Sequence, residues 1–175
     1  RTAIIDPLPT ANDLTYNGLL QALVTAGTCA NGTIKYSEEG PGGEYSTTIP
    51  TKKNAGTYSV YYMSVGNPGY EDYVAVNPIT VTIAPAPVTV TAENKTKVYG
   101  EADPALTATV TGLISGESES LITYTLSRTE DGENAGNYTI TPDGDALQVN
   151  YDVSFVNGTL TISKRTVGIT WGETS

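Results

Sequence analysis

The chain has 175 residues and a formal net charge of −10, from 9 basic and 19 acidic residues. A surface that binds nucleic acid or an anionic membrane needs a basic patch, so this charge argues against both partners. The sequence has no histidine and a single cysteine, Cys29, which excludes an internal disulfide and a cysteine-based zinc site. We therefore expect neither a metal nor another cofactor.

The composition favours short β-strands joined by turns. Thr, Val, Ile and Tyr are abundant, and 18 Gly and 10 Pro interrupt the chain at short intervals. β-Branched and aromatic side chains suit a pleated, half-buried surface. No segment shows the periodicity of a long amphipathic helix or the length of a membrane-spanning one. The sequence has no βαβ pattern, which argues against a parallel sheet.

Four segments in the first half of the chain are predicted to be strands. Asn31-Gly32 and Gly42-Gly43 are predicted to supply positive-φ turn positions between them. The four predicted strands are Leu20–Val24, Thr33–Tyr36, Thr57–Val65 and Ile79–Ile83.

Six further strands are predicted in the second half. From Leu106 to Val110, apolar residues alternate with threonine, which places the apolar side chains on one face. Asn157-Gly158 predicts a hairpin between the last two strands, and 116–120 predicts one helical turn. The six strands are Val88–Thr91, Leu106–Thr111, Ile122–Leu126, Tyr138–Thr141, Tyr151–Phe155 and Thr159–Ile162.

The chain repeats itself. Asn54-Ala55-Gly56-Thr57-Tyr58 recurs as Asn134-Ala135-Gly136-Asn137-Tyr138, about 80 residues later, and other landmarks recur in the same order. This period is longer than that of a solenoid repeat and suits a small sandwich domain. Ala84-Pro85-Ala86-Pro87 predicts a short, stiff connector. The predicted divisions are a first repeat at 1–84, a second at 85–164, and the opening strand of a truncated third repeat at 165–175.

The repeated Asn-Ala-Gly-x-Tyr unit is typical of the start of strand F in immunoglobulin-like domains. There a tyrosine hydroxyl bonds back to the backbone and forms the tyrosine corner. Tyr58 and Tyr138 are predicted to have this structural role, followed by Val60 and Ile140 where antibody domains have cysteines. The alternative is a plain glycine-containing turn before an antiparallel strand. We therefore predict two tandem immunoglobulin-like β-sandwich domains.

The second half contains, in order, the segments Lys97-Val98-Tyr99-Gly100-Glu101-Ala102-Asp103-Pro104, Gly112–Glu117, Leu126–Arg128, Gly132–Tyr138, Asn150-Tyr151 and Gly158–Ile162. This set resembles the MBG domain of bacterial extracellular proteins, of the type marked by a Tyr-Gly-x signature. The first half, with Tyr16-Asn17-Gly18, resembles more loosely a related immunoglobulin-like repeat of bacterial surface proteins. The resemblance implies a stalk or adhesin repeat that is secreted or lies on the bacterial cell surface, and it transfers no catalytic residue.

The favoured function is a structural spacer, which we expect to be monomeric and not an enzyme. The clustered carboxylates of the chain, at 38–39, 117–119 and 130–133, are predicted to be solvated loop charges and not a catalytic pair. The alternative function is binding of glycans or mucin. For it, Tyr61 and Tyr73 are the candidate ligand contacts, because exposed tyrosines can stack on sugar rings.

Two further alternatives stay open. Asp143-Gly144-Asp145 matches only the first positions of a calcium loop. A Lys–Asn crosslink would need Lys95, Lys97 or Lys164 beside an Asn and a carboxylate, and sequence alone does not place these side chains.

Overall fold

The computed structural model describes residues 1–129 and 132–169, and the protein is all-β, as predicted. The chain divides into two compact units. Unit 1 comprises Arg1–Ala86 with Val149–Tyr151, and unit 2 comprises Pro87–Gln148 with Asp152–Ser175. Within the described residues, no helix is both long enough and apolar enough to span a membrane.

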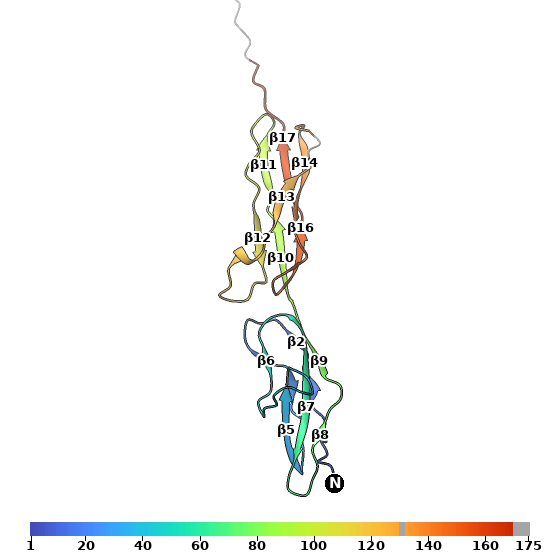
Figure 1. Ribbon diagram of the computed structural model, residues 1–175. Coiled ribbons are helices and arrows are strands. Elements are labelled where there is room, and N and C mark those ends of the chain that lie inside the picture. The colour runs from blue at the N-terminus through green and yellow to red at the C-terminus, as the bar shows by residue number, and fades with distance from the viewer. Residues whose placement is uncertain (130–131, 170–175) are drawn as a thin grey trace, which may run out of the picture. The chain divides into compact units, whose positions relative to one another are not determined.

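Unit 1 contains nine strands, of which β7 is the longest (Figure 1). They are β1 (Thr10–Ala11), β2 (Leu14–Thr15), β3 (Gln21–Ala22), β4 (Val24–Thr25), β5 (Gly32–Ser37), β6 (Thr51–Lys52), β7 (Gly56–Gly66), β8 (Tyr73–Val74) and β9 (Ile79–Ala84). Five of them form a sheet in the order β2-β9-β7-β5, with β8 also paired to β7. β1 pairs with β4 and β3 pairs with β6, so the strand predicted at 20–24 is divided between two sheets.

β7 organises the core of unit 1 because its side chains alternate between two faces. Val60 and Tyr62 are buried on one face, in line with the half-buried Tyr58. Tyr61 and Met63 point to the other face and are half-buried. The apolar face of β7 thus supplies the surface against which the rest of the unit packs.

Unit 2 contains eight strands and one 3₁₀ turn in its described residues. The strands are β10 (Ala86–Ala92), β11 (Lys95–Val98), β12 (Ala108–Thr111), β13 (Thr125–Arg128), β14 (Gly136–Asp143), β15 (Leu147–Gln148), β16 (Tyr151–Val156) and β17 (Gly158–Ser163), of which β10 and β16 each have their first residue in unit 1. The turn, Glu119–Leu121, overlaps the predicted helical turn, whereas β13 begins three residues after the start predicted for it. Two four-stranded sheets result, in the orders β12-β10-β16-β15 and β11-β17-β14-β13.

The core of unit 2 joins these two sheets. Ala92 of the first sheet packs in one buried cluster with Ile140, Leu160 and Ile162 of the second. Removing these apolar surfaces from water is the main favourable term that holds the sheets face to face.

Each unit contains a parallel strand pair, which the sequence argued against. β2 pairs in parallel with β9, and β11 pairs in parallel with β17. A parallel pair needs a long connection between its strands. Here that connection is most of the unit itself and not a helix, which is why a search for βαβ patterns does not find it.

Several glycines have a role different from the predicted one. The hairpin predicted at Asn157-Gly158 is wrong, because β16 and β17 belong to different sheets. Gly158 is needed at this crossing because a Cβ there would lie 2.6 Å from the Ala92 carbonyl oxygen. Gly32 and Gly42-Gly43 do not have positive φ either; in that region Gly40 does.

Residues 164–169 form no strand, and Val167 and Ile169 are exposed. The predicted opening strand of a third repeat extends to positions outside the described residues. The third repeat and the predicted domain bounds therefore remain predictions.

Gly112→Ala is expected to destabilise unit 2 more than Gly116→Ala. Both glycines have positive φ, at 98° and 88°, so both substitutions carry the left-handed backbone penalty of about 1 kcal/mol. A Cβ at Gly112 would also lie 2.6 Å from the Pro87 carbonyl oxygen, whereas at Gly116 nothing lies within 4 Å. Urea denaturation of the two variants measures the difference, and equal midpoints would contradict the steric argument.

Candidate functional site

The Tyr-Gly signature forms a tight turn at the end of β11. The Glu101 amide donates to the Val98 carbonyl at 3.0 Å, which closes a four-residue turn with Tyr99 and Gly100 at its centre. Gly100 has φ +84°, the left-handed conformation that favours glycine at this turn position. The Glu101 carboxylate accepts from the Val98 amide at 3.1 Å. The turn reverses the chain and brings the residues after it back towards β11.

Lys97, on β11 just before this turn, has a buried ammonium group. Its side chain is 3% exposed, although lysine is almost never found fully buried without a partner. The Nζ atom donates to Asp103 Oδ1 at 2.5 Å, to Glu133 Oε2, and to the Glu101 carbonyl at 3.2 Å. All three ammonium protons therefore have acceptors.

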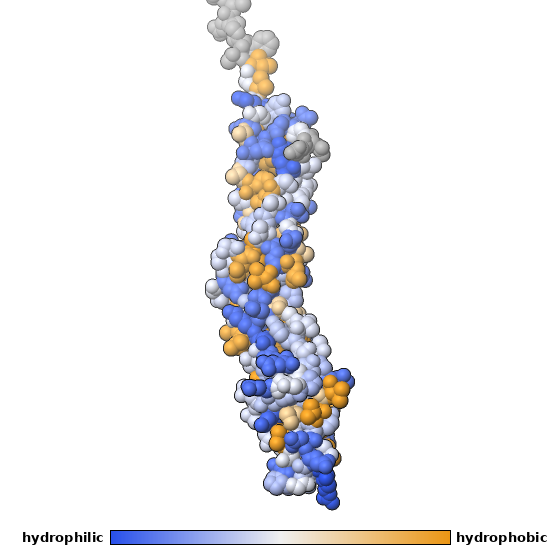
Figure 2. Space-filling model, in the orientation of Figure 1, coloured by the Kyte–Doolittle hydropathy of each residue, from blue (hydrophilic) through white to orange (hydrophobic). Residues whose placement is uncertain are grey.

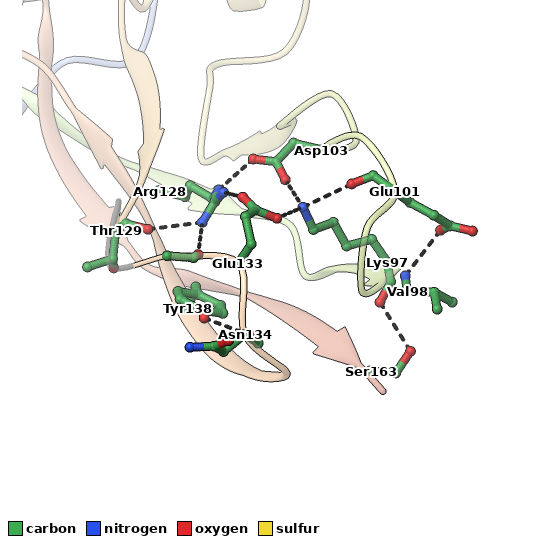
Figure 3. A network of polar contacts seen from close by, with 11 residues as sticks. Lys97, Val98, Glu101, Asp103, Arg128, Thr129, Glu133, Asn134, Tyr138 and Ser163 are labelled. Carbon is green, nitrogen blue, oxygen red and sulfur yellow. Dashed lines mark hydrogen bonds and ion pairs between the residues drawn. The ribbon is translucent and has the colours of Figure 1, made fainter. Parts of the chain in front are cut away.

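Arg128, on β13, binds the same two carboxylates. Its Nε donates to Asp103 Oδ2 at 2.5 Å, and its Nη2 donates to Glu133 Oε1 (Figure 3). Each carboxylate thus bridges both cations, and the two positive and two negative charges balance. We call Lys97, Asp103, Arg128 and Glu133 the charged clasp.

The clasp connects the two edges of one sheet. β11 and β13 are the outer strands of the order β11-β17-β14-β13. Lys97 lies opposite Ile162, and Arg128 lies opposite Ile140. Each cation is therefore directly across the sheet pairing from a residue of the core cluster. Asp103 and Glu133 come from loops after β11 and before β14, and they close the ring over this end of the core.

A tyrosine hydroxyl bonds back to the backbone at the start of the long strand in each unit. Tyr138 donates to the Asn134 carbonyl at 2.8 Å, and Tyr58 donates to the Asn54 carbonyl at 2.8 Å. A cation also lies over each ring: Arg128 is 5.4 Å from the Tyr138 centroid, and Lys52 is 5.7 Å from that of Tyr58. In unit 2 the clasp and this tyrosine are thus joined through Arg128.

The clasp shifts the pKa values of its members in the direction that keeps them charged. Hydrogen bonds first from Lys97 and then from Arg128 lower the pKa of the Asp103 carboxyl. The hydrogen bond from Lys97 is also the main cause of the lowered pKa of Glu133. Hydrogen bonds to Asp103 and Glu133 raise the pKa of Lys97. All four groups are therefore ionised at neutral pH.

This charge state determines what the clasp can do chemically. A general acid or nucleophile needs a group that can lose or gain a proton near the working pH. Lys97, held as an ammonium, is a poor nucleophile, and each of the two carboxylates is bound by both Lys97 and Arg128. The ring is therefore suited to holding strands together. Glu133, predicted to be a solvated loop charge, is instead a member of the ring, while residues 130–131 lie outside the described residues.

Tyr61 and Tyr73, the candidate ligand contacts, lie on opposite faces of the main sheet of unit 1. Tyr61 is opposite Ser37 in the register, whereas Tyr73 is opposite Ser64 on the alternate face of β7. Tyr73 is 40% exposed and lines an apolar hollow of about 230 Å³ with Leu8. The structure does not bring the two tyrosines together, and their ligand-binding role remains a prediction.

The remaining acidic groups form no metal cage in the described part of the chain, where no group of three or more acidic or cysteine side chains could hold an ion. Asp143 and Asp145 line an open hollow of about 480 Å³ with Tyr124 and Gln148. Glu38 forms an ion pair with Lys52 at 2.7 Å.

Acid is expected to weaken unit 2. An acidic group with a lowered folded-state pKa stabilises the fold above its unfolded pKa, and this contribution is lost as pH falls through the folded pKa. Unfolding of unit 2 in urea is therefore expected at lower concentration at about pH 3 than at about pH 7, since free Asp and Glu titrate near 4. Because the pKa of Lys97 is raised, its contribution is present at neutral pH and is lost only in strong alkali.

Glu133→Gln is expected to reduce this acid dependence, because it removes one of the two titrating carboxylates. Asp152→Asn, at an exposed position of β16, is the matched control and is expected to leave it unchanged. An unaltered pH profile for Glu133→Gln would contradict the assignment.

Comparison with known proteins supports the sequence-based interpretation of the second half. No curated protein matches the chain. One solved structure, described as "Structures of Clostridium thermocellum CbhA fibronectin(III)-like modules", is 14% identical and covers 99% of this chain and 100% of that chain. Its TM-score is 0.29. Residues 88–161, which contain the whole charged clasp, match the family described as "MBG domain (YGX type)", which confirms the resemblance predicted for the second half of the chain.

Proposed function

We propose that the chain is a pair of structural spacer repeats in an extracellular surface protein of the stalk or adhesin class. In this proposal the two units are tandem immunoglobulin-like sandwiches joined at residues 84–87, and neither is an enzyme. The MBG match fits a repeat module of a surface protein. The single observation that carries the structural role is the charged clasp.

The clasp supports this role because the motif residues that carry the family resemblance pair with one another inside the unit. Lys97 and Asp103 flank the Tyr-Gly turn, Arg128 ends β13, and Glu133 precedes the repeated Asn-Ala-Gly-x-Tyr unit. Their charged atoms bind one another, so each already has a partner, although the Asp103 and Glu133 side chains are 38% and 51% exposed. Residues that recognise a ligand would instead keep free donors and acceptors at the surface. A module whose characteristic residues fasten its own strands is suited to keeping its shape.

The surface of the chain is consistent with a secreted spacer. On the face in Figure 2, hydrophobic residues form small groups among hydrophilic ones. A net charge of −10 favours solubility and repels anionic polymers such as nucleic acids.

Antibodies raised against this chain are expected to label intact cells of the organism that produces it, and brief protease treatment of those cells is expected to remove the label. An internal cytosolic protein, labelled in parallel, must stay negative on intact cells and appear only after lysis. Labelling of the chain only after lysis would overturn the surface assignment.

Glycan or mucin binding is the alternative function, with Tyr61 and Tyr73 as contacts. It predicts retention of the chain on a glycan array and loss of that retention in Tyr73→Ala or Tyr61→Ala. Tyr99→Ala, at another half-exposed tyrosine, is the control. The spacer proposal expects no retention of any of these proteins, because the hollow beside Tyr73 is lined mainly by apolar side chains and gives sugar hydroxyls few partners.

A further inference from the structure

Parallel pairing places the start and the end of each unit side by side. β11 lies near the start of unit 2 and pairs with β17, its last strand, whereas in unit 1 β2 pairs with β9. Tension along the chain pulls the earlier strand towards its N-terminal end and the last strand towards its C-terminal end. Adjacent parallel strands must then slide past each other. Their hydrogen bonds are consequently strained together instead of opening one at a time.

The parallel pairing is longer in unit 2 than in unit 1. In unit 2 it runs over four register pairs, from Lys95 opposite Leu160 to Val98 opposite Ser163. In unit 1 it runs over two, at Leu14 and Thr15. Each pairing is extended by one matching bond, from the Tyr99 amide to the Ser163 carbonyl at 2.9 Å and from the Tyr16 amide to the Ala84 carbonyl at 2.8 Å. Sliding therefore breaks more bonds at once in unit 2.

The first segments of the two units also differ. β10, with seven residues, lies between β12 and β16 in its sheet, and its Val88 and Val90 are fully buried. In the fully described 1–86 segment, the chain before β1 forms no regular strand: it has isolated bridges from Thr2 to Glu71 and from Ile5 to Cys29, a few further backbone hydrogen bonds, and the buried Ala3 and Ile5. Tension reaches a central, seven-residue strand in unit 2 but a segment with only isolated bridges in unit 1.

The charged clasp reinforces the parallel pairing of unit 2. Lys97 lies within that pairing, opposite Ile162, while Arg128 fastens the same two carboxylates to the far edge of the sheet. When β11 slides, Lys97 separates from Glu133, and Asp103, which follows β11 in the chain, separates from Arg128. In unit 1 the corresponding position, opposite Ile83, is occupied by Leu14, which cannot form an ion pair.

We propose that the two units respond differently to tension: unit 1 unfolds first and lengthens the chain, while unit 2 stays folded. For its use in the cell this inference rests on the proposed spacer function. The difference in resistance itself is a property of the two strand arrangements.

The order of unfolding can be measured by pulling the complete chain between handles at its two ends in an optical trap. The two units are close in length, so unit 1 is marked by inserting about ten Gly and Ser residues after Gly42, which adds about 35 Å to the extension it releases. A Cβ at Gly42 would contact nothing within 4 Å, so the insertion disturbs little. The lengthened step is expected in the lower-force event. Its appearance in the higher-force event, or a single force for both units, would overturn the proposal.

The contribution of the clasp is tested with Lys97→Leu, which introduces the side chain that unit 1 has at the matching position. At a fixed force, unit 2 is expected to unfold roughly tenfold faster, because breaking interactions that resist unfolding raises its rate. Lys164→Leu, at an exposed lysine outside the clasp, is the control and is expected to have no effect. If Lys97→Leu fails to fold, Glu133→Gln removes only one carboxylate and is expected to accelerate unfolding in the same direction. An unchanged rate in a folded clasp variant would show that the clasp does not resist tension.

Failure of this proposal and failure of the spacer function give different results. Cells labelled on their surface, together with equal unfolding forces, would retain the spacer and reject the division of roles. Ordered unfolding, together with labelling only after lysis, would retain the mechanical difference and reject the surface function.

Discussion

The buried ammonium group of Lys97 is the constraint that holds together the end of unit 2 at which the Tyr99-Gly100 turn lies. Taking a charge out of water is costly unless opposite charges and hydrogen bonds compensate for it. Asp103, Glu133 and the Glu101 carbonyl provide that compensation, and Arg128 balances the second negative charge. Two loops and both edges of a sheet are thus held in one arrangement, because displacing any one of them leaves a charge without its partner.

This constraint gives a physical meaning to the Tyr-Gly signature. The turn at Tyr99-Gly100 reverses the chain directly after β11, and it places the Glu101 carbonyl and the Asp103 carboxylate within reach of Lys97. Glycine is required because its φ of +84° is strained for other residues. The signature therefore acts through backbone geometry: it positions the acceptors for a buried cation a few residues earlier in the chain.

The two units have the same arrangement of strands around a tyrosine, but they differ in the charged groups that stabilise it. Both have a tyrosine that bonds back to an asparagine carbonyl, a cation over that tyrosine ring, and a parallel pairing of an early strand with the last. In unit 2 the cation over the ring also belongs to the clasp, so the corner, the sheet edges and the core are coupled. In unit 1 the corresponding cation, Lys52, is 36% exposed and pairs with Glu38 at the surface, where such pairs contribute little, whereas Lys97 and Arg128 are 3% and 15% exposed.

The sequence by itself determined the all-β class, the positions of the long strands such as β7 and β14, and the family resemblance of the second half. Alternating apolar residues and repeated motifs are local signals, so they can be recognised without knowledge of the fold. Only the tertiary structure decided the parallel pairings, the crossing at Gly158 between two sheets, and the clasp. Lys97 and Glu133 are distant in sequence, and each alone resembles an ordinary surface charge. Their partnership exists only because strand order and register bring opposite edges of one sheet to the same end of the core.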